Sequence, residues 1–90
     1  MNRVAVRVPV QEAIGRAAAS QRSGDLVEAA SLCSAVLEVA PEHFDALLLS
    51  GIVERQRGNA SRALDLVSRA LAVNPRSFDA LLHRDRKSVV

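Results

Sequence analysis

The pentapeptide FDALL occurs twice in this sequence, at residues 44–48 and at residues 78–82, an interval of 34 residues. A segment that returns at a fixed interval of this size indicates a supersecondary unit used more than once. Aligning residues 10–43 with residues 44–77 extends the match well beyond the pentapeptide. The identical pairs are Gly24 and Gly58, Ala29 and Ala63, Leu32 and Leu66, Ser34 and Ser68, Leu37 and Leu71, Val39 and Val73, and Pro41 and Pro75. The sequence therefore predicts two complete units, at 10–43 and 44–77, and a third that begins at residue 78.

Each unit is predicted to contain two helices. In the second unit the first helix covers residues 44–57, with Gly58 as a left-handed terminating residue and Asn59 as the N-cap of the next helix. The second helix covers residues 60–73 and ends because the residue before Pro75 is disfavoured in the helical region. Three- and four-residue steps predict one buried face on it, made of Ala63, Leu64, Val67, Ala70 and Leu71.

The first unit repeats this plan. Gly24 is expected to end its first helix, and Asp25 with Glu28 resembles a capping box for its second helix, which runs to Val39 or Ala40. In the second unit, Gly51 is expected to be a point of close approach between helices.

Composition agrees with a helical domain and constrains its function only weakly. The chain has 90 residues, a formal charge of +2 and only two aromatic residues. Its arginines are interspersed with acidic residues, so we expect no nucleic-acid partner. No apolar run reaches the roughly 18 residues of a membrane span, and the single cysteine, Cys33, allows no internal disulfide. We expect residues 1–9 to be a frayed lead-in and the protein to be cytoplasmic, without a membrane partner.

With these features, the chain resembles the tetratricopeptide repeat family, in a version typical of longer bacterial proteins. The likeness covers residues 10 to about 82 and is carried by Gly24, Ala29, Leu37 and Pro41 in the first unit and Leu47, Gly51, Gly58, Ala63, Ala70 and Pro75 in the second. The resemblance implies an all-α fold in which antiparallel helix pairs stack as a short right-handed solenoid. It also implies that the first helices line a concave groove that binds a peptide or a partner helix.

Helical spacing places the candidate groove residues on the first helix of each unit. They are Gln11, Ile14, Ala18, Gln21 and Arg22; Asp45, Leu48, Ile52, Arg55 and Gln56; and Asp79 and Leu82. Two interpretations remain open for Leu48 and Ile52, because they could form a mildly apolar groove or pack against neighbouring helices. Some members of the family bind a terminal carboxylate through groove lysines and asparagines, a mode not expected here because the only lysine is Lys87.

Nothing in the sequence predicts catalysis, a metal site or a cofactor. His43 and His83 have no cysteine or carboxylate cluster at a suitable spacing, and Cys33 is expected to be a small buried hydrophobe. We interpret the charged residues Glu54, Arg55, Arg57 and Arg62 as a solvated face. The sequence therefore predicts a non-catalytic interaction scaffold. The alternative is that these repeats select substrates for a larger enzyme of the glycosyltransferase or sulfotransferase type.

The third unit differs from the second after residue 84. Asp85, Arg86 and Lys87 stand where the second unit has Gly51, Ile52 and Val53, and charges there would face the preceding unit. One back-translation of residues 85–90 also resembles a common sequencing-adapter oligonucleotide. We therefore expect a truncated third unit at 78–84 and a non-native tail at 85–90, with a natural short tail as the alternative. The uncapped C-terminal end, including Leu81 and Leu82, is expected to promote self-association.

Overall fold

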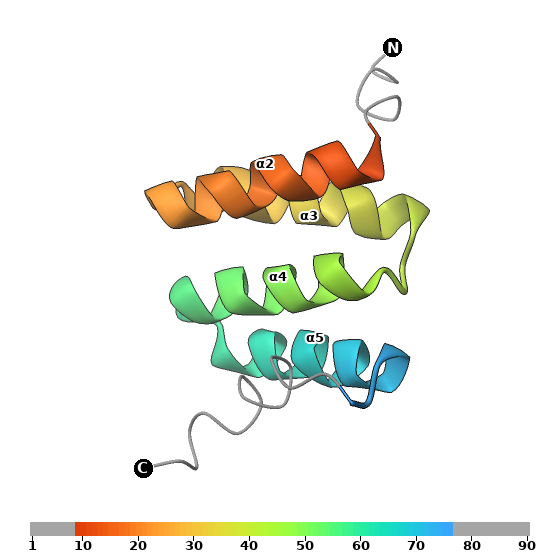
Figure 1. Ribbon diagram of the computed structural model, residues 1–90. Coiled ribbons are helices and arrows are strands. Elements are labelled where there is room, and N and C mark those ends of the chain that lie inside the picture. The colour runs from red at the N-terminus through yellow and green to blue at the C-terminus, as the bar shows by residue number, and fades with distance from the viewer. Residues whose placement is uncertain (1–8, 77–90) are drawn as a thin grey trace.

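The computed structural model describes residues 9–76, which form four α-helices and, within that range, no strand. The helices are α2 (Val10–Ser23), α3 (Leu26–Val39), α4 (Phe44–Gln56) and α5 (Ala60–Val73). Figure 1 shows the chain running back and forth, so that each helix is antiparallel to the one before it. The predicted all-α arrangement of stacked antiparallel helix pairs is confirmed.

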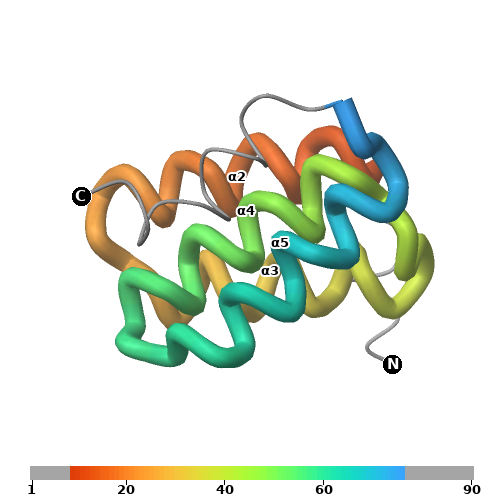
Figure 2. Tube along the Cα trace, turned by 90° about the horizontal axis from the view of Figure 1, so that it is seen from below, coloured from red at the N-terminus to blue at the C-terminus, as the bar shows by residue number. Residues whose placement is uncertain are grey.

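The two pairs stack through α4. Helix α2 packs against α3 and α4 packs against α5, while α4 also contacts both α3 and α2. Seen from below in Figure 2, α2 and α4 lie toward one side of the molecule and α3 and α5 toward the other. The first helices of the two pairs therefore form one layer, in which α2 and α4 run in the same direction.

Short polar and glycine signals set the helix ends. The Asp25 carboxylate accepts a hydrogen bond from the Glu28 amide (3.2 Å), but the Asp25 amide donates to the Ser20 carbonyl (2.8 Å). Only the Asp25 half of the predicted capping box is therefore present. Gly24 and Gly58 both adopt left-handed conformations, with φ of 92° and 90°. Helix α4 ends at Gln56, one residue before the predicted end.

Small apolar residues fill the contact between the two pairs. Ala13, Val36 and Ala46, which come from three different helices, form one buried cluster. Leu37 of the first pair packs against a second cluster, which contains Leu47 of the second pair. This burial removes apolar surface from water along the whole contact between the pairs.

The contact between α4 and α5 depends on Gly51. A Cβ atom at this position would lie 2.7 Å from Cγ2 of Val67 and 3.3 Å from the carbonyl oxygen of Ala63. Real Cβ atoms essentially never approach another heavy atom within 3.0 Å. The expectation that Gly51 allows close helix approach is confirmed.

One part of the predicted buried face of α5 is wrong. Leu64 is 51% exposed, whereas Leu66, which lies outside the predicted face, is 1% exposed. Leu64 follows Ala63 by one residue and so lies about 100° around the helix from it. Leu66 instead belongs to the cluster that Leu37 contacts, so the neighbouring pair determines which leucine is buried.

Several predictions fall outside the described residues. These are the lead-in up to residue 8, the third unit at 78–84 and the tail at 85–90, together with His83. Pro9 is described and is the N-cap of α2. None of the helices within residues 9–76 is long and apolar enough to cross a membrane.

Candidate binding face on the first helices

The candidate groove residues within the described range all lie on α2 and α4. They are Gln11, Ile14, Ala18, Gln21 and Arg22 on α2, and Asp45, Leu48, Ile52, Arg55 and Gln56 on α4, and we call this set the groove face. None of the ten is buried, so each side chain is at least partly accessible to solvent. Asp79 and Leu82 lie outside the described residues.

A hydrogen bond joins the two helices of the groove face near their C-terminal ends. Nε2 of Gln21 donates to Oε1 of Gln56 at 3.0 Å, across 35 positions of sequence. The bond occupies one N–H of Gln21 and one lone pair of Gln56, and leaves the NH₂ group of Gln56 and the oxygen of Gln21 for other partners. This contact brings residues from the two predicted halves of the groove side by side.

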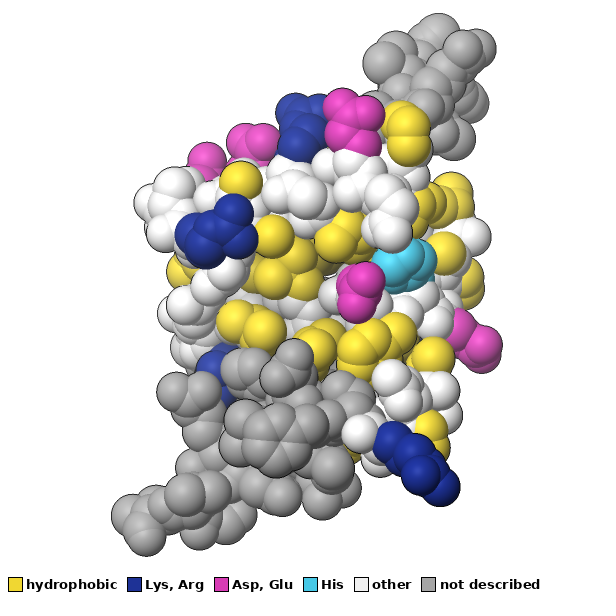
Figure 3. Space-filling model, in the orientation of Figure 1, with side chains coloured by type: hydrophobic (Ala, Val, Ile, Leu, Met, Phe, Trp, Pro, Cys, Tyr) yellow, Lys and Arg dark blue, Asp and Glu magenta, His cyan; other side chains and the backbone are white. Residues whose placement is uncertain are grey.

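The middle of the groove face is apolar. Figure 3 shows hydrophobic side chains gathered in a band between α2 and α4 and along α4. Ile14 packs against the cluster that contains Ala46, and Leu48 packs against the cluster that contains Val67. Ile52 is half-buried but belongs to none of the core clusters formed by the described residues. Leu48 thus contributes to the core, whereas Ile52 has the same intermediate burial but is in none of these clusters.

Charged side chains stand at the two ends of the groove face. Asp45 lies in the first turn of α4 and is exposed, while Arg22 lies in the last turn of α2 and is also exposed. Arg55, in the last turn of α4, is half-buried. Because α2 and α4 run in the same direction, both arginines lie at the same end and Asp45 lies at the other.

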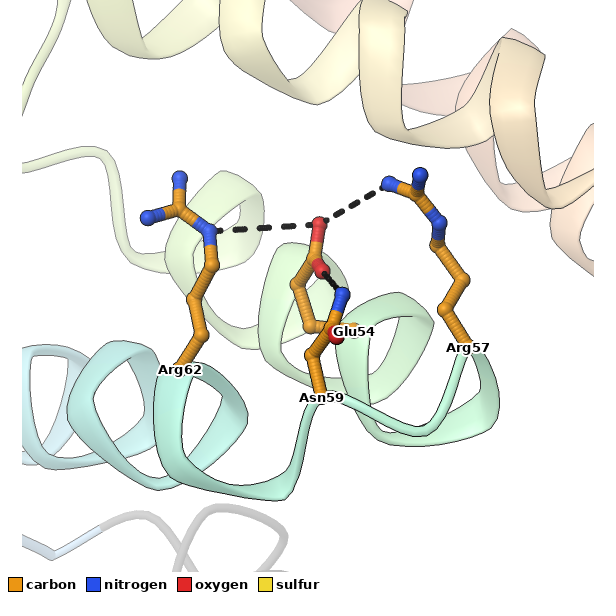
Figure 4. A network of polar contacts seen from close by, with 4 residues as sticks. All are labelled: Glu54, Arg57, Asn59 and Arg62. Carbon is orange, nitrogen blue, oxygen red and sulfur yellow. Dashed lines mark hydrogen bonds and ion pairs between the residues drawn. The ribbon is translucent and has the colours of Figure 1, made fainter.

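The prediction of a solvated charged face is wrong for Glu54. This residue is 6% exposed, and its carboxylate is the centre of the polar cluster drawn in Figure 4. Oε1 accepts a hydrogen bond from Nδ2 of Asn59 at 2.6 Å, and Oε2 lies 3.3 Å from Nη1 of Arg57 and 4.0 Å from Nε of Arg62. The buried carboxylate is therefore compensated on two sides, as burial of a charge requires.

Helical spacing could have identified Glu54 as a buried residue. It follows the buried residues Leu47 and Ser50 at seven and four positions, which places it on the same side of α4. The hydrogen bond from Asn59 to the buried Glu54 carboxylate was harder to predict, because Asn59 also occupies the N-cap position of α5. Its side chain makes no capping hydrogen bond there and donates to Glu54 instead.

Cys33 and His43 both have structural roles. Cys33 is fully buried, and burial together with the nearby Glu54 carboxylate raises the pKa of its thiol from 9.0 to about 11. A thiol with a raised pKa is a poor nucleophile, which agrees with the predicted role of a small hydrophobe. Nδ1 of His43 accepts a hydrogen bond from the Ala46 amide (3.2 Å) and so caps α4. Among residues 9–76, no group of three or more His, Cys, Asp or Glu side chains could hold a metal ion.

Comparison with known proteins agrees with this architecture. The family model described as Tetratricopeptide repeat matches residues 21–84, which is more than half of the chain. The comparison with curated proteins found no match. The matched range includes the C-terminal end of α2 and all of α3, α4 and α5. The chain belongs to the tetratricopeptide repeat family.

Proposed function

We propose that this protein is a non-catalytic scaffold that binds a peptide or a partner helix on the groove face. Tetratricopeptide repeats generally mediate protein–protein interaction, and the family assignment supports that class of function. The observation that carries the proposal for this surface is the half-buried apolar band of Ile14, Ala18, Leu48 and Ile52 on two parallel helices. Such a band, bordered by polar residues, is the usual composition of a site that docks another chain.

The groove face differs from the other accessible apolar residues in its organisation. Val27 and Leu64 are 71% and 51% exposed, but they lie on α3 and α5 in the opposite layer. Isolated exposed hydrophobic residues are normal on protein surfaces. On the groove face, Gln21 and Gln56 bridge the two helices, so the apolar band lies on a preorganised surface. Preorganisation lowers the entropic cost of binding.

The proposal can be tested with the full chain and a displayed library of random 12-residue peptides. Enriched peptides are synthesised and their affinity is measured by calorimetry against the wild type, Ile52→Glu and Leu64→Glu. Both substitutions place a carboxylate on a partly exposed apolar position, but only Ile52 belongs to the groove face. Far-UV circular dichroism first confirms that each variant keeps its helix content.

We expect Ile52→Glu to weaken binding at least tenfold and Leu64→Glu to change it less than twofold. A binding peptide that is equally sensitive to both substitutions, or more sensitive to Leu64→Glu, would show that another surface binds. Failure to enrich any peptide would argue against a peptide-binding scaffold altogether.

A further inference from the structure

We infer that the partner segment is bipolar: an apolar middle, an acidic end that lies over the exposed Arg22, and a basic end that lies over the exposed Asp45. This inference rests on the proposed function and specifies its partner. It follows from where the charges of the groove face stand relative to the direction of α2 and α4.

The charged residues at the ends of α2 and α4 are arranged so that they stabilise these helices. Acidic residues occur in the first turns of α2 and α4, and arginines occur in their last turns. This arrangement complements the helix dipole and stabilises each helix. The dipole therefore explains the sign of the charge at each helix end, without any reference to a partner.

The stacking of the helix pairs brings the end charges of α2 and α4 together, so the groove face has a basic end and an acidic end. Within a pair the helices are antiparallel, and the second helices lack this pattern: α3 has an acidic residue in its first turn but no basic residue in its last turn, and α5 has neither. Helices α2 and α4 are the first helices of successive pairs and run in the same direction, so their arginines gather at one end. Figure 3 shows basic side chains toward one end of the band between α2 and α4 and an acidic side chain near the other. A charged side chain carries a full charge, whereas the helix end beside it carries only about half a charge of the opposite sign. The side chains therefore set the sign of the charge at each end of the groove face.

The dimensions of the groove face set the length of the segment. Asp45 and Arg55 are separated by ten positions of α4, or about 15 Å at ~1.5 Å per residue. An extended chain covers this distance with about four or five residues. The apolar residues Leu48 and Ile52 lie between the two charges, and the NH₂ group of Gln56 lies beside the basic end. A short segment with one acidic and one basic flank therefore matches the surface in length, polarity and hydrogen-bonding groups.

The expected effect is on orientation and selectivity more than on total affinity. Charges at the rim of an interface stay partly solvated and contribute little free energy, but like charges brought together are unfavourable. Asp45 and Arg22 are exposed, and neither has an ion pair within residues 9–76. A segment with acidic residues at both ends would bring an acidic end against Asp45. A segment with basic residues at both ends would bring a basic end against Arg22.

Four synthetic peptides test the inference on the full chain. They share one five-residue apolar middle and carry two-residue flanks that are acidic at both ends, basic at both ends, or mixed in either order, with blocked termini. Affinity is measured by calorimetry at about 50 mM and 300 mM salt. We expect the better mixed peptide to bind at least fivefold tighter than either uniform peptide at low salt, and this advantage to shrink at high salt.

A spin label on the acidic end of the mixed peptide then reports its orientation. We expect it to broaden the backbone amide signals of Gln21 and Gln56 more than that of Asp45. The double variant Arg22→Glu with Asp45→Lys should remove this preference. The matched control is Glu38→Lys with Arg69→Glu, a charge exchange between exposed residues of α3 and α5, which should keep the preference.

The outcomes separate this inference from the proposed function. Equal binding of all four peptides, or broadening centred on Asp45, would overturn the bipolar partner while leaving a peptide-binding groove in place. If no peptide binds but the display selection has yielded binders that depend on Ile52, the bipolar partner is also wrong. If neither approach yields a groove binder, both proposals fail.

Discussion

Gly51 and Gly15 are both interior residues of first helices, yet their surroundings differ. Apart from its chain neighbours and the backbone of its own helix, a Cβ atom at Gly15 would meet nothing within 4 Å, whereas one at Gly51 would clash with Val67 and approach the Ala63 carbonyl. Val67 is β-branched and buried, so it has little freedom to move away. The two glycines therefore allow the intrinsic cost of glycine in a helix to be separated from the cost of crowding.

We predict opposite effects of alanine at these positions. Gly15→Ala should raise the free energy of unfolding by about 0.5–1 kcal/mol, because alanine is the better helix former. Gly51→Ala should lower it by about 1–3 kcal/mol, since the clash outweighs that gain. Thermal and urea unfolding followed by far-UV circular dichroism measures both. Stabilisation by Gly51→Ala would contradict the close contact between α4 and α5.

Cys33 gives the protein an alkaline dependence of stability. Burial, and secondarily Glu54, raise the pKa of its thiol to about 11, above the ordinary value of 9.0. Between these values the unfolded chain loses the thiol proton and the folded chain keeps it, so the folded state binds more protons. The contribution of Cys33 to the free energy of unfolding is therefore predicted to be highest below pH 9. It should fall between pH 9 and 11, by roughly 2–3 kcal/mol in total.

The composition of the chain makes this measurement clean. It contains no tyrosine, and Lys87 is its only lysine, so few other side chains titrate in this range. Cys33→Val introduces the residue that the second unit has at the same repeat position, Val67. We expect urea unfolding of this variant to show a much flatter dependence between pH 9 and 11. An equally steep dependence in the variant would rule out Cys33 as its source.

At the scale of elements, α5 begins in an unusual way. Asn59 occupies the N-cap position of this helix, but Nδ2 of its side chain donates to the buried Glu54 carboxylate at 2.6 Å. Aspartate is usually as good an N-cap as asparagine. Here we predict that Asn59→Asp lowers the free energy of unfolding by at least 1 kcal/mol, because it replaces a donor with a second carboxylate.

A second substitution should rescue that variant. In Asn59→Asp with Glu54→Gln, the donor and the acceptor exchange places, and the hydrogen bond can form again. The double variant should therefore be more stable than the sum of the two single changes predicts, by about 0.5–3 kcal/mol in a double-mutant cycle. Additive effects in the cycle, measured by urea unfolding, would show that the two side chains do not interact.

The same elements show what the sequence could predict and what it could not. The repeat and its glycine, asparagine and proline signals predicted the bounds of α5 and the end of α2, because these features act locally. Leu64 and Glu54 were assigned to the wrong environment, because burial at the edge of a helical face depends on the neighbouring helix pair. The predicted stack of antiparallel pairs already implied that α2 and α4 run in the same direction, but the hydrogen bond between Gln21 and Gln56 depends on the distance between the helices, which the sequence does not give. Binding at the groove face stays a prediction.

At the scale of the whole molecule, the stability of these 90 residues by themselves depends on how many helix pairs stack together. Two complete pairs are fewer than the three or so repeats that usually make such a stack stable. We predict that the full chain self-associates at tens of micromolar through its C-terminal end, where Leu81 and Leu82 lie outside the described residues. Leu82→Asp should weaken this association at least tenfold in sedimentation equilibrium. Val27→Asp, on an exposed position of α3, should have no effect. A monomeric wild type with a sharp melt at high temperature would contradict the prediction.

The central claim is that partners bind where α2 and α4 lie side by side. Its most direct test is a titration of the ¹⁵N-labelled full chain with the tightest peptide from the display selection, followed by amide chemical-shift changes. We predict that the largest changes occur at Ile14, Ala18, Leu48 and Ile52 and extend to Gln21 and Gln56. Changes concentrated instead around Val27 on α3 or Leu64 on α5, with the groove face unaffected, would contradict the account.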